Sequence, residues 1–246
     1  RQVDKAIAFV ESQEDTGWFL FLHLMDPHGP YLAPERHLRG SDEDFDDPVE
    51  RLYEAEIRYT DEQLQRLFEV LPEKAWIVLT SDHGEEFWEH NEFEHGHSLY
   101  DELIKVPFIV KAPGLSGQVS ELPVSLLDVT PTMLALAGLR QAPTEGLNLV
   151  PAIQGDSAVQ QQLVERLQGF GRPLYGQERW GVLDGSVKWT SHQGDEEVYD
   201  LASDPLERND LSSTMQSVHA RALQFAPKVS PTERRRGDTL SFVRRF

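Results

Sequence analysis

Histidines and carboxylates gather in two short stretches of the chain, and these residues have the types that do chemistry. His28 lies in MDPHGPY, while Asp82, His83 and His95 lie in SDHGEEFWEHNEFEHGHSLYDE. Each stretch follows an apolar run of strand length, and α/β proteins build their sites in the loops after strands. A carboxylate beside an imidazole suits a hard or borderline divalent cation. A further imidazole carries a proton to or from a reacting group.

An isolated Asp-His pair also has a structural interpretation, as a turn carboxylate beside a capping histidine. The second stretch favours a site, because it has four histidines and little apolar content. Its other acidic residues are interpreted as mostly solvated charges, namely Glu85, Glu86, Glu92 and Glu94. His23 lies inside an apolar run and is interpreted as a hydrogen-bonded core residue.

Strands and helices that alternate along the chain must position these residues. Apolar runs predict strands over 18–25, 75–80 and 106–114. Helical spacing predicts a helix in the opening twelve residues and another over 48–71. A third helix is expected in VSLLDVTPTMLALAGL, with Pro131 in its first turn and Gly138 as its cap.

The C-terminal third has a different sequence pattern, with shorter elements separated by turn residues. A polar helix is expected over 154–171. Short strand-like pieces separated by Asp-Gly and Gly-Asp turns then predict an antiparallel meander. The acidic run 41–50 is interpreted as a solvated loop.

Composition excludes several classes of function. The 246 residues include 23 Lys+Arg and 42 Asp+Glu, so the formal charge is −19. Such an excess repels nucleic acids and anionic lipid surfaces. The absence of Cys excludes disulfides and a cysteine nucleophile within these residues. No apolar run is long enough to span a bilayer. The chain opens on Arg1 within an amphipathic pattern, which is typical of the middle of a protein.

The order of the motifs resembles the sulfatase family of the alkaline phosphatase superfamily. The matching segments are FLFLHLMDPHGPY, YEAEIRYTDEQL, IVLTSDHGEEFWEH, HGHSLYDELIKVPFIVKAPG, VSLLDVTPTMLALAGL and EEVYDLASDPLERNDL. The resemblance covers roughly residues 1–212. It implies an α/β, alkaline-phosphatase-like fold: a mixed, mostly parallel sheet flanked by helices, with a small C-terminal antiparallel sheet. We expect 1–155 to be the C-terminal part of the catalytic domain, 156–215 a linker helix with the small sheet, and 216–246 a tail.

The resemblance also implies roles for single residues. Asp82 and His83 match the family's second pair of metal ligands, and calcium is the first expectation, with magnesium, manganese or zinc as alternatives. His28 matches the histidine that hydrogen-bonds the ester or protonates the leaving oxygen. His95 falls near the position where many sulfatases have a Lys that contacts the sulfate. This departure makes sulfate specificity less secure than fold and metal binding.

The resemblance implies metal-dependent hydrolysis of sulfate esters, on a small molecule or a glycan. The nucleophile, a formylglycine made in a C/S-x-P-x-R motif, and the first metal-binding carboxylates belong to an N-terminal region that this chain lacks. SPTER at Ser230 does not match, because Thr and Glu stand between its Pro and its Arg, where the motif has one residue. The chain alone is therefore expected to be inactive. The alternatives are a phosphomonoesterase, phosphodiesterase or phosphoryl-group transferase on the same scaffold, and a non-catalytic metal-binding module. The compartment and the oligomeric state stay open; family resemblance suggests a periplasmic or extracellular protein.

Overall fold

The computed structural model describes residues 2–14, 17–38, 47–114, 117–171, 179–192 and 195–215. These residues form two compact units. Unit 1 comprises residues 1–95 and 105–120, and unit 2 comprises 96–104 and the chain from 121 onward. The predicted boundary at residue 155 stays a prediction, and the predicted tail lies outside the described residues. Among the described residues, no helix is both long enough and apolar enough to cross a bilayer.

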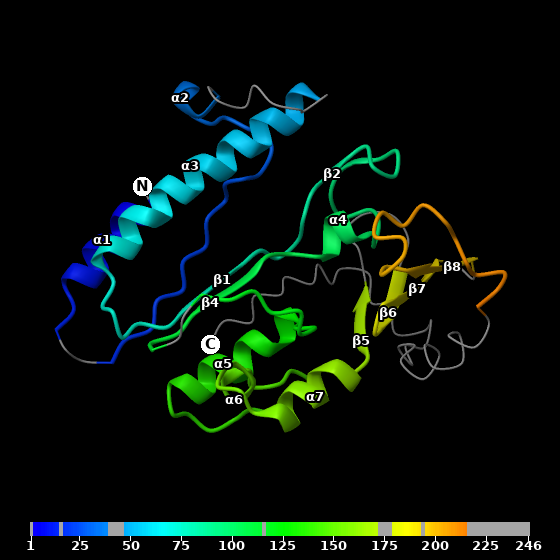
Figure 1. The fold of residues 1–246 in the computed structure, drawn as a ribbon. Helices are drawn as coiled ribbons and strands as arrows, with labels where there is room; N and C mark the ends of the chain where they lie inside the picture. Colours follow the sequence, from blue (N-terminus) through cyan, green and yellow to red (C-terminus); the bar gives the residue numbers. More distant parts are fainter. Residues whose placement is uncertain are drawn as a thin grey trace, which may run out of the picture. The chain divides into compact units, whose positions relative to one another are not determined.

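Unit 1 is built from helices and short strands (Figure 1). Its elements are α1 (Gln2–Glu11), α2 (Glu35–Leu38), α3 (Pro48–Val70), β1 (Ile77–Thr80), β2 (Glu86–Phe87), β3 (Phe93–Glu94) and β4 (Phe108–Lys111). Unit 2 contains more strand pairing. Its elements are α4 (Asp101–Ile104), the 3-10 turn η1 (Leu126–Asp128), α5 (Val129–Leu136), α6 (Val150–Ile153), α7 (Ser157–Glu165), β5 (Gln168–Gly171), β6 (Arg179–Asp184), β7 (Val187–His192) and β8 (Asp195–Asp200).

Helices α1 and α3 pack side by side in unit 1 and form its core (Figure 1). Val3, Ala6 and Val10 of α1 are buried together with Leu67 of α3. The predicted helix over 48–71 is confirmed. Its start follows from ordinary capping, because the Asp47 side chain accepts a 2.7 Å hydrogen bond from the backbone N–H of Val49.

Residues 18–25 are extended, but the predicted strand is not formed. Residues at even positions are half-buried and pack on the α1–α3 core, whereas the odd positions are exposed, Phe21 by 79%. The interpretation of His23 as a core residue is therefore wrong, because its side chain is exposed. The alternation has the period of a strand. A strand also needs a hydrogen-bonded neighbour, and no other described segment forms a ladder with this one.

The predicted strands over 75–80 and 106–114 are confirmed in shorter form as β1 and β4. They pair antiparallel, with Ile77 opposite Lys111 and Thr80 opposite Phe108. The confirmed features are the mixed α/β character and the small C-terminal antiparallel sheet. The parallel part of the expected sheet is not found among the described residues, where every strand pair is antiparallel. Parallel pairing needs a further strand beside β1, and 18–25 does not supply it.

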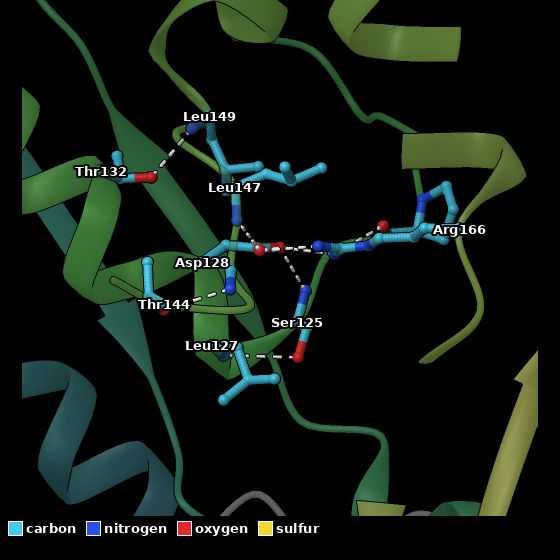
Figure 2. Close-up of polar contacts among 10 residues, drawn as sticks. Ser125, Leu127, Asp128, Thr132, Thr144, Leu147, Leu149 and Arg166 are labelled. Carbon is cyan, nitrogen blue, oxygen red and sulfur yellow. Dashed lines mark hydrogen bonds and ion pairs between the residues drawn. The ribbon is translucent and has the colours of Figure 1, made fainter. Parts of the chain in front are cut away.

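A buried carboxylate organises the helical part of unit 2. Asp128 precedes α5 and is fully buried. Figure 2 shows its two oxygens between the guanidinium of Arg166, at 2.7 and 2.5 Å, and the backbone N–H groups of Ser125 and Leu147, each at 2.8 Å. The predicted helix is confirmed as α5, with Gly138 beyond its end at φ +66°. One carboxylate thereby ties together the start of α5, the loop before α6 and the end of α7.

The end of the predicted helix over 154–171 is wrong. Helix α7 ends at Glu165, and Gln168–Gly171 forms strand β5, paired with β6. This short glycine-containing segment becomes a strand because the neighbouring strand β6 provides its hydrogen-bond partners, which periodicity within the segment does not reveal. The antiparallel meander is confirmed in β6, β7 and β8. Val182, Trp189 and Val198 form the core on one face of this sheet.

Candidate active site

Three imidazole rings lie together in unit 1. The ring centroids of His28 and His95 are 5.2 Å apart, edge to face. Those of His83 and His95 are 4.0 Å apart and stacked. His28 follows the extended segment 18–25, His83 follows β1 and His95 follows β3. The structure thus brings the three histidines into one cluster, although His28 is more than fifty residues from the others. Their chemical roles stay predictions.

His95 is held by a buried carboxylate that the sequence analysis interpreted as solvated. Its Nδ1 atom lies 2.7 Å from Oε1 of Glu85, whose side chain is only 3% exposed. The other oxygen of Glu85 accepts a 2.8 Å hydrogen bond from the hydroxyl of Tyr31. A carboxylate accepts, so Nδ1 of His95 carries the proton and Nε2 is the atom left for other partners. The interpretation of Glu85 as a solvated charge is wrong.

The phenol groups beside Glu85 are affected by the same environment. Burial, followed by the hydrogen bond to Glu85, raises the pKa of Tyr31. Burial, followed by the charge of Glu85, raises the pKa of Tyr53. The ring centroids of the two tyrosines are 5.6 Å apart, and Phe87 packs on both. Tyr31 therefore remains a neutral donor, which keeps the Glu85 carboxylate fixed toward His95.

A residue of helix α3 positions His28 by binding its backbone N–H group. The N–H of His28 donates a 3.2 Å hydrogen bond to Oε2 of Glu56, and the N–H of Leu32 donates to Oε1 of the same residue. Glu56 is buried, and burial raises the pKa of its carboxyl. The Nδ1 atom of His28 lies 2.8 Å from the carbonyl oxygen of Gly29. A carbonyl only accepts, so Nε2 of His28 is available to another group.

The position of Glu56 on its helix is a sequence signal for a buried carboxylate that was not used in the prediction of the site. In YEAEIRYTDEQL, Glu56 is three residues after Tyr53, on the helical stripe that is buried, whereas Ile57 is 44% exposed. A carboxylate on the buried stripe needs partners. The backbone of the His28 loop supplies them.

Asp82 and His83 follow β1 and form the predicted metal pair. Oδ1 of Asp82 lies 3.9 Å from Nε2 of His83, and the Asp82 side chain is 82% exposed. Nδ1 of His83 lies 2.7 Å from the carbonyl oxygen of Gly84, so Nε2 carries the lone pair. Two ligands of one cation span this distance, because each bond to the metal is about 2.0–2.6 Å. The residues thus fit a cation in part. Among the described residues, no group of three or more His, Asp or Glu surrounds a metal position.

The loop that carries His95 is held by Glu86. This residue is fully buried, and its Oε1 accepts hydrogen bonds from the backbone N–H groups of His90 and Glu92, at 3.0 and 2.9 Å. The interpretation of Glu86 as a solvated charge is wrong. The indole of Trp88, whose backbone φ is +74°, donates to Asp47. These contacts give the polar loop a defined shape.

The arrangement combines imidazole groups with a carboxylate–imidazole pair, which are groups that can act on an ester of an oxyanion. Two imidazoles present Nε2 atoms, and a carboxylate–imidazole pair is open to a cation. Breaking an ester of an oxyanion builds negative charge on the leaving oxygen, which imidazole donors and a cation stabilise.

Comparison with known proteins identifies the family. The sulfatase family model matches residues 1–139. The chain belongs to the sulfatase family. It is 30% identical over 173 residues to the choline-sulfatase of Rhizobium meliloti. This alignment covers 66% of this chain and 33% of that protein. It is 30% identical over 144 residues to the Delta 4,5-hexuronate-2-O-sulfatase of Bacteroides thetaiotaomicron, covering 55% of this chain and 30% of that protein.

A solved structure agrees with the predicted fold. The crystal structure of Ps i-CgsB superposes with a TM-score of 0.75 at 20% identity, over 91% of this chain and 52% of that one. At this identity the likeness shows the alkaline-phosphatase-like fold. The chain spans about a third of the length of the curated relatives it matches.

Proposed function

We propose that this chain is part of an enzyme that hydrolyses sulfate esters. The observation that carries the proposal is the imidazole cluster of His28, His83 and His95, at ring separations of 5.2 and 4.0 Å, with Asp82 next to it. Membership of the sulfatase family supports the same reaction. The nucleophile, by the family resemblance, belongs to a region outside these 246 residues.

His28 and His95 act on the ester in this proposal. The carbonyl of Gly29 holds one proton on Nδ1 of His28, so in the imidazolium form the second proton, on Nε2, is the one that passes to the leaving oxygen and leaves the ring neutral. His95 is oriented by Glu85, and in its imidazolium form the Nε2–H group donates a hydrogen bond to the ester oxygens. Proton delivery matters because an alkoxide is a poor leaving group.

Asp82 and His83 would hold the divalent cation, with calcium as the first expectation. When bound, the cation supplies positive charge that stabilises the ester oxygens and the nucleophile. A carboxylate oxygen and an imidazole nitrogen are suitable donors for such an ion. With only these two donors the chain by itself is expected to bind the ion weakly, since most of its ligands are then water.

The substrate is proposed to be a sulfate ester of a small molecule or a glycan. Relatives that support this class include a choline-sulfatase and a hexuronate-2-O-sulfatase. An excess of 19 acidic groups means that the local cation and imidazoles, and not the overall charge, attract the anionic ester.

The test compares matched aryl sulfate and aryl phosphate substrates with the whole enzyme, before and after chelation and metal return. We expect metal-dependent sulfate release that Asp82→Asn and His83→Ala reduce at least about 100-fold, while the exposed Asp61→Asn on α3 has no effect. Hydrolysis of the phosphate alone would make the enzyme a phosphoesterase. No turnover of either ester would support a non-catalytic metal-binding module.

A further inference from the structure

The four-stranded sheet of unit 2 has two unlike faces. One face carries the core residues Val182, Trp189 and Val198. Side chains alternate between faces along a strand, and directly paired residues share a face. The register therefore places two polar rows on the opposite face. Arg179, His192 and Asp195 form one cross-strand row, and Thr190 pairs with Glu197 in the next.

A cavity of about 170 Å³ opens on this polar face. Its walls include the side chains of both polar rows and the ring of Tyr100, from the segment just before α4. A water molecule occupies about 30 Å³ of liquid, so the cavity has room for about five or six waters. That space suits one small ring and not an extended chain.

The lining of the cavity mixes hydrogen-bond donors and acceptors. The Tyr100 hydroxyl lies 3.4 Å from each carboxylate oxygen of Glu197, and Oγ1 of Thr190 lies 3.4 Å from Oε2. These distances are long for hydroxyl–carboxylate bonds, which have a mode of about 2.7–2.8 Å. Tyr100 is half-buried, and burial raises its pKa, so the phenol stays a neutral donor. The contacts are therefore loose enough for Glu197 to take a hydroxyl donor from a ligand.

The charges exclude a strongly anionic ligand. Among the lining residues that are charged throughout the neutral pH range, which leaves out His192, Arg179 contributes one positive charge, and Asp195 and Glu197 contribute two negative charges. A sulfate or phosphate dianion would meet a wall with more negative than positive charge. A neutral ligand must instead accept hydrogen bonds from the guanidinium and donate hydrogen bonds to the carboxylates. Both kinds of group must lie on one small ring.

We propose that this cavity binds a single neutral saccharide ring. Each sugar hydroxyl is both a donor and an acceptor, so adjacent hydroxyls satisfy Arg179 and Glu197 together. The C–H face of the ring packs against the ring of Tyr100 and the side chain of Leu99, which also lines the cavity. The residues that line the site all belong to unit 2. The inference concerns binding, beyond the ester hydrolysis proposed above.

The test uses the 246-residue chain and NMR titration with methyl β-D-galactopyranoside, methyl β-D-glucopyranoside and N-acetylglucosamine, with sodium sulfate as the anion probe. We expect saturable binding of at least one sugar, with a Kd on the order of millimolar. Glu197→Gln and Arg179→Gln should each weaken this binding at least about tenfold. Glu165→Gln, on the exposed surface of α7, is the matched control and should leave it unchanged.

Three results would overturn the proposal: no saturable sugar binding up to about 100 mM, sugar binding that neither cavity variant weakens, or shifts at the cavity with sulfate alone. Thermal unfolding of each variant checks its fold. Arg179→Gln decides the matter if Glu197→Gln fails to fold, because Arg179 is the first residue of β6. Turnover is not measured, so failure here is distinct from failure of the proposed hydrolysis.

Discussion

The imidazole of His95 and the carboxylate of Glu85 are joined by a 2.7 Å contact between Nδ1 and Oε1. The opposite oxygen of that carboxylate accepts from Tyr31, so the phenol, the carboxylate and the imidazole form a chain of three groups. Such a chain selects one ring tautomer and one ring orientation for the histidine. His95 is consequently oriented even though it follows a two-residue strand in a polar loop.

Glu85→Gln should weaken catalysis through His95. An amide holds the imidazole less firmly and does not stabilise its protonated form, so kcat of the whole enzyme is expected to fall about 10- to 100-fold with little change in KM. Tyr31→Phe keeps the carboxylate and should cost less. Steady-state kinetics with an aryl sulfate measure both. A Glu85→Gln enzyme within twofold of the parent would show that His95 does not need this partner.

His28→Ala should lower kcat most for substrates with poor leaving groups. If Nε2 of His28 protonates the leaving oxygen, its loss is expected to cost about 10²- to 10⁴-fold. The penalty should shrink as the leaving phenol becomes more acidic, because a stable phenolate needs no proton. A series of substituted phenyl sulfates measures this dependence. A penalty that is the same across the series would assign His28 to ester binding instead of proton delivery.

Helices were more predictable from the sequence than strands. The period of apolar residues located α3 to within one residue of its end. The same reasoning predicted a strand over 18–25 and missed β5 at Gln168–Gly171. A helix satisfies its hydrogen bonds locally, whereas a strand depends on a neighbour that periodicity does not identify.

Residue type was enough to predict the histidines of the candidate site. It did not predict the buried carboxylates that hold them in place. His28, His83 and His95 were selected by type and by their places after predicted strands, and the structure clusters them. Glu85 was interpreted as solvated and Glu56 was not considered, yet both are buried. Burial of a carboxylate depends on tertiary partners, here Tyr31, His95 and the backbone of the His28 loop, which no local pattern reveals.

Lys188→Met should destabilise unit 2 strongly. Lys188 is 1% exposed, and its Nζ lies 2.9 Å from Asp101 and 2.7 Å from Glu207. Removing the Lys188 ammonium leaves the carboxylates of Asp101 and Glu207 without a positive partner in a buried site. This is expected to lower the free energy of unfolding by about 3–5 kcal/mol. Urea denaturation of the 246-residue chain measures the loss. Lys105→Met, at an exposed position, is the matched control and should change it by less than about 0.5 kcal/mol.

The loss in Lys188→Met should depend on pH in a defined direction. Burial raises the pKa of Glu207 above the ordinary value of 4.5, although Lys188 opposes this. A raised pKa means that the folded protein binds more protons, so stability falls as pH rises from about 4.5 through the folded pKa. Because Lys188 lowers the pKa of Glu207, the pH range over which stability falls extends to higher pH when Lys188 is removed. Adding Glu207→Gln should flatten the dependence, and an unchanged slope would contradict this account.

Gly146→Ala should destabilise the region around Asp128. A Cβ atom at Gly146 would overlap the backbone carbonyl of Leu127, which cannot move as a side chain does. Forced repacking against backbone is expected to cost about 3 kcal/mol or more. Gly169→Ala, where a Cβ meets nothing within 4 Å, is the control and should change stability by less than about 1 kcal/mol. Equal melting temperatures for the two variants would disprove the close approach.

His95→Lys should shift the whole enzyme toward sulfate esters. A sulfate monoester carries one negative charge at all physiological pH values, which a permanent ammonium matches, whereas an imidazole changes its charge near neutrality, as a phosphate ester does. The ratio of kcat/KM for matched aryl sulfate and aryl phosphate is therefore expected to rise, with a flatter pH profile. His95→Gln, which is neutral at every pH, separates loss of the imidazole from gain of the charge. A ratio that stays within about a factor of two of the parent would place specificity outside this loop.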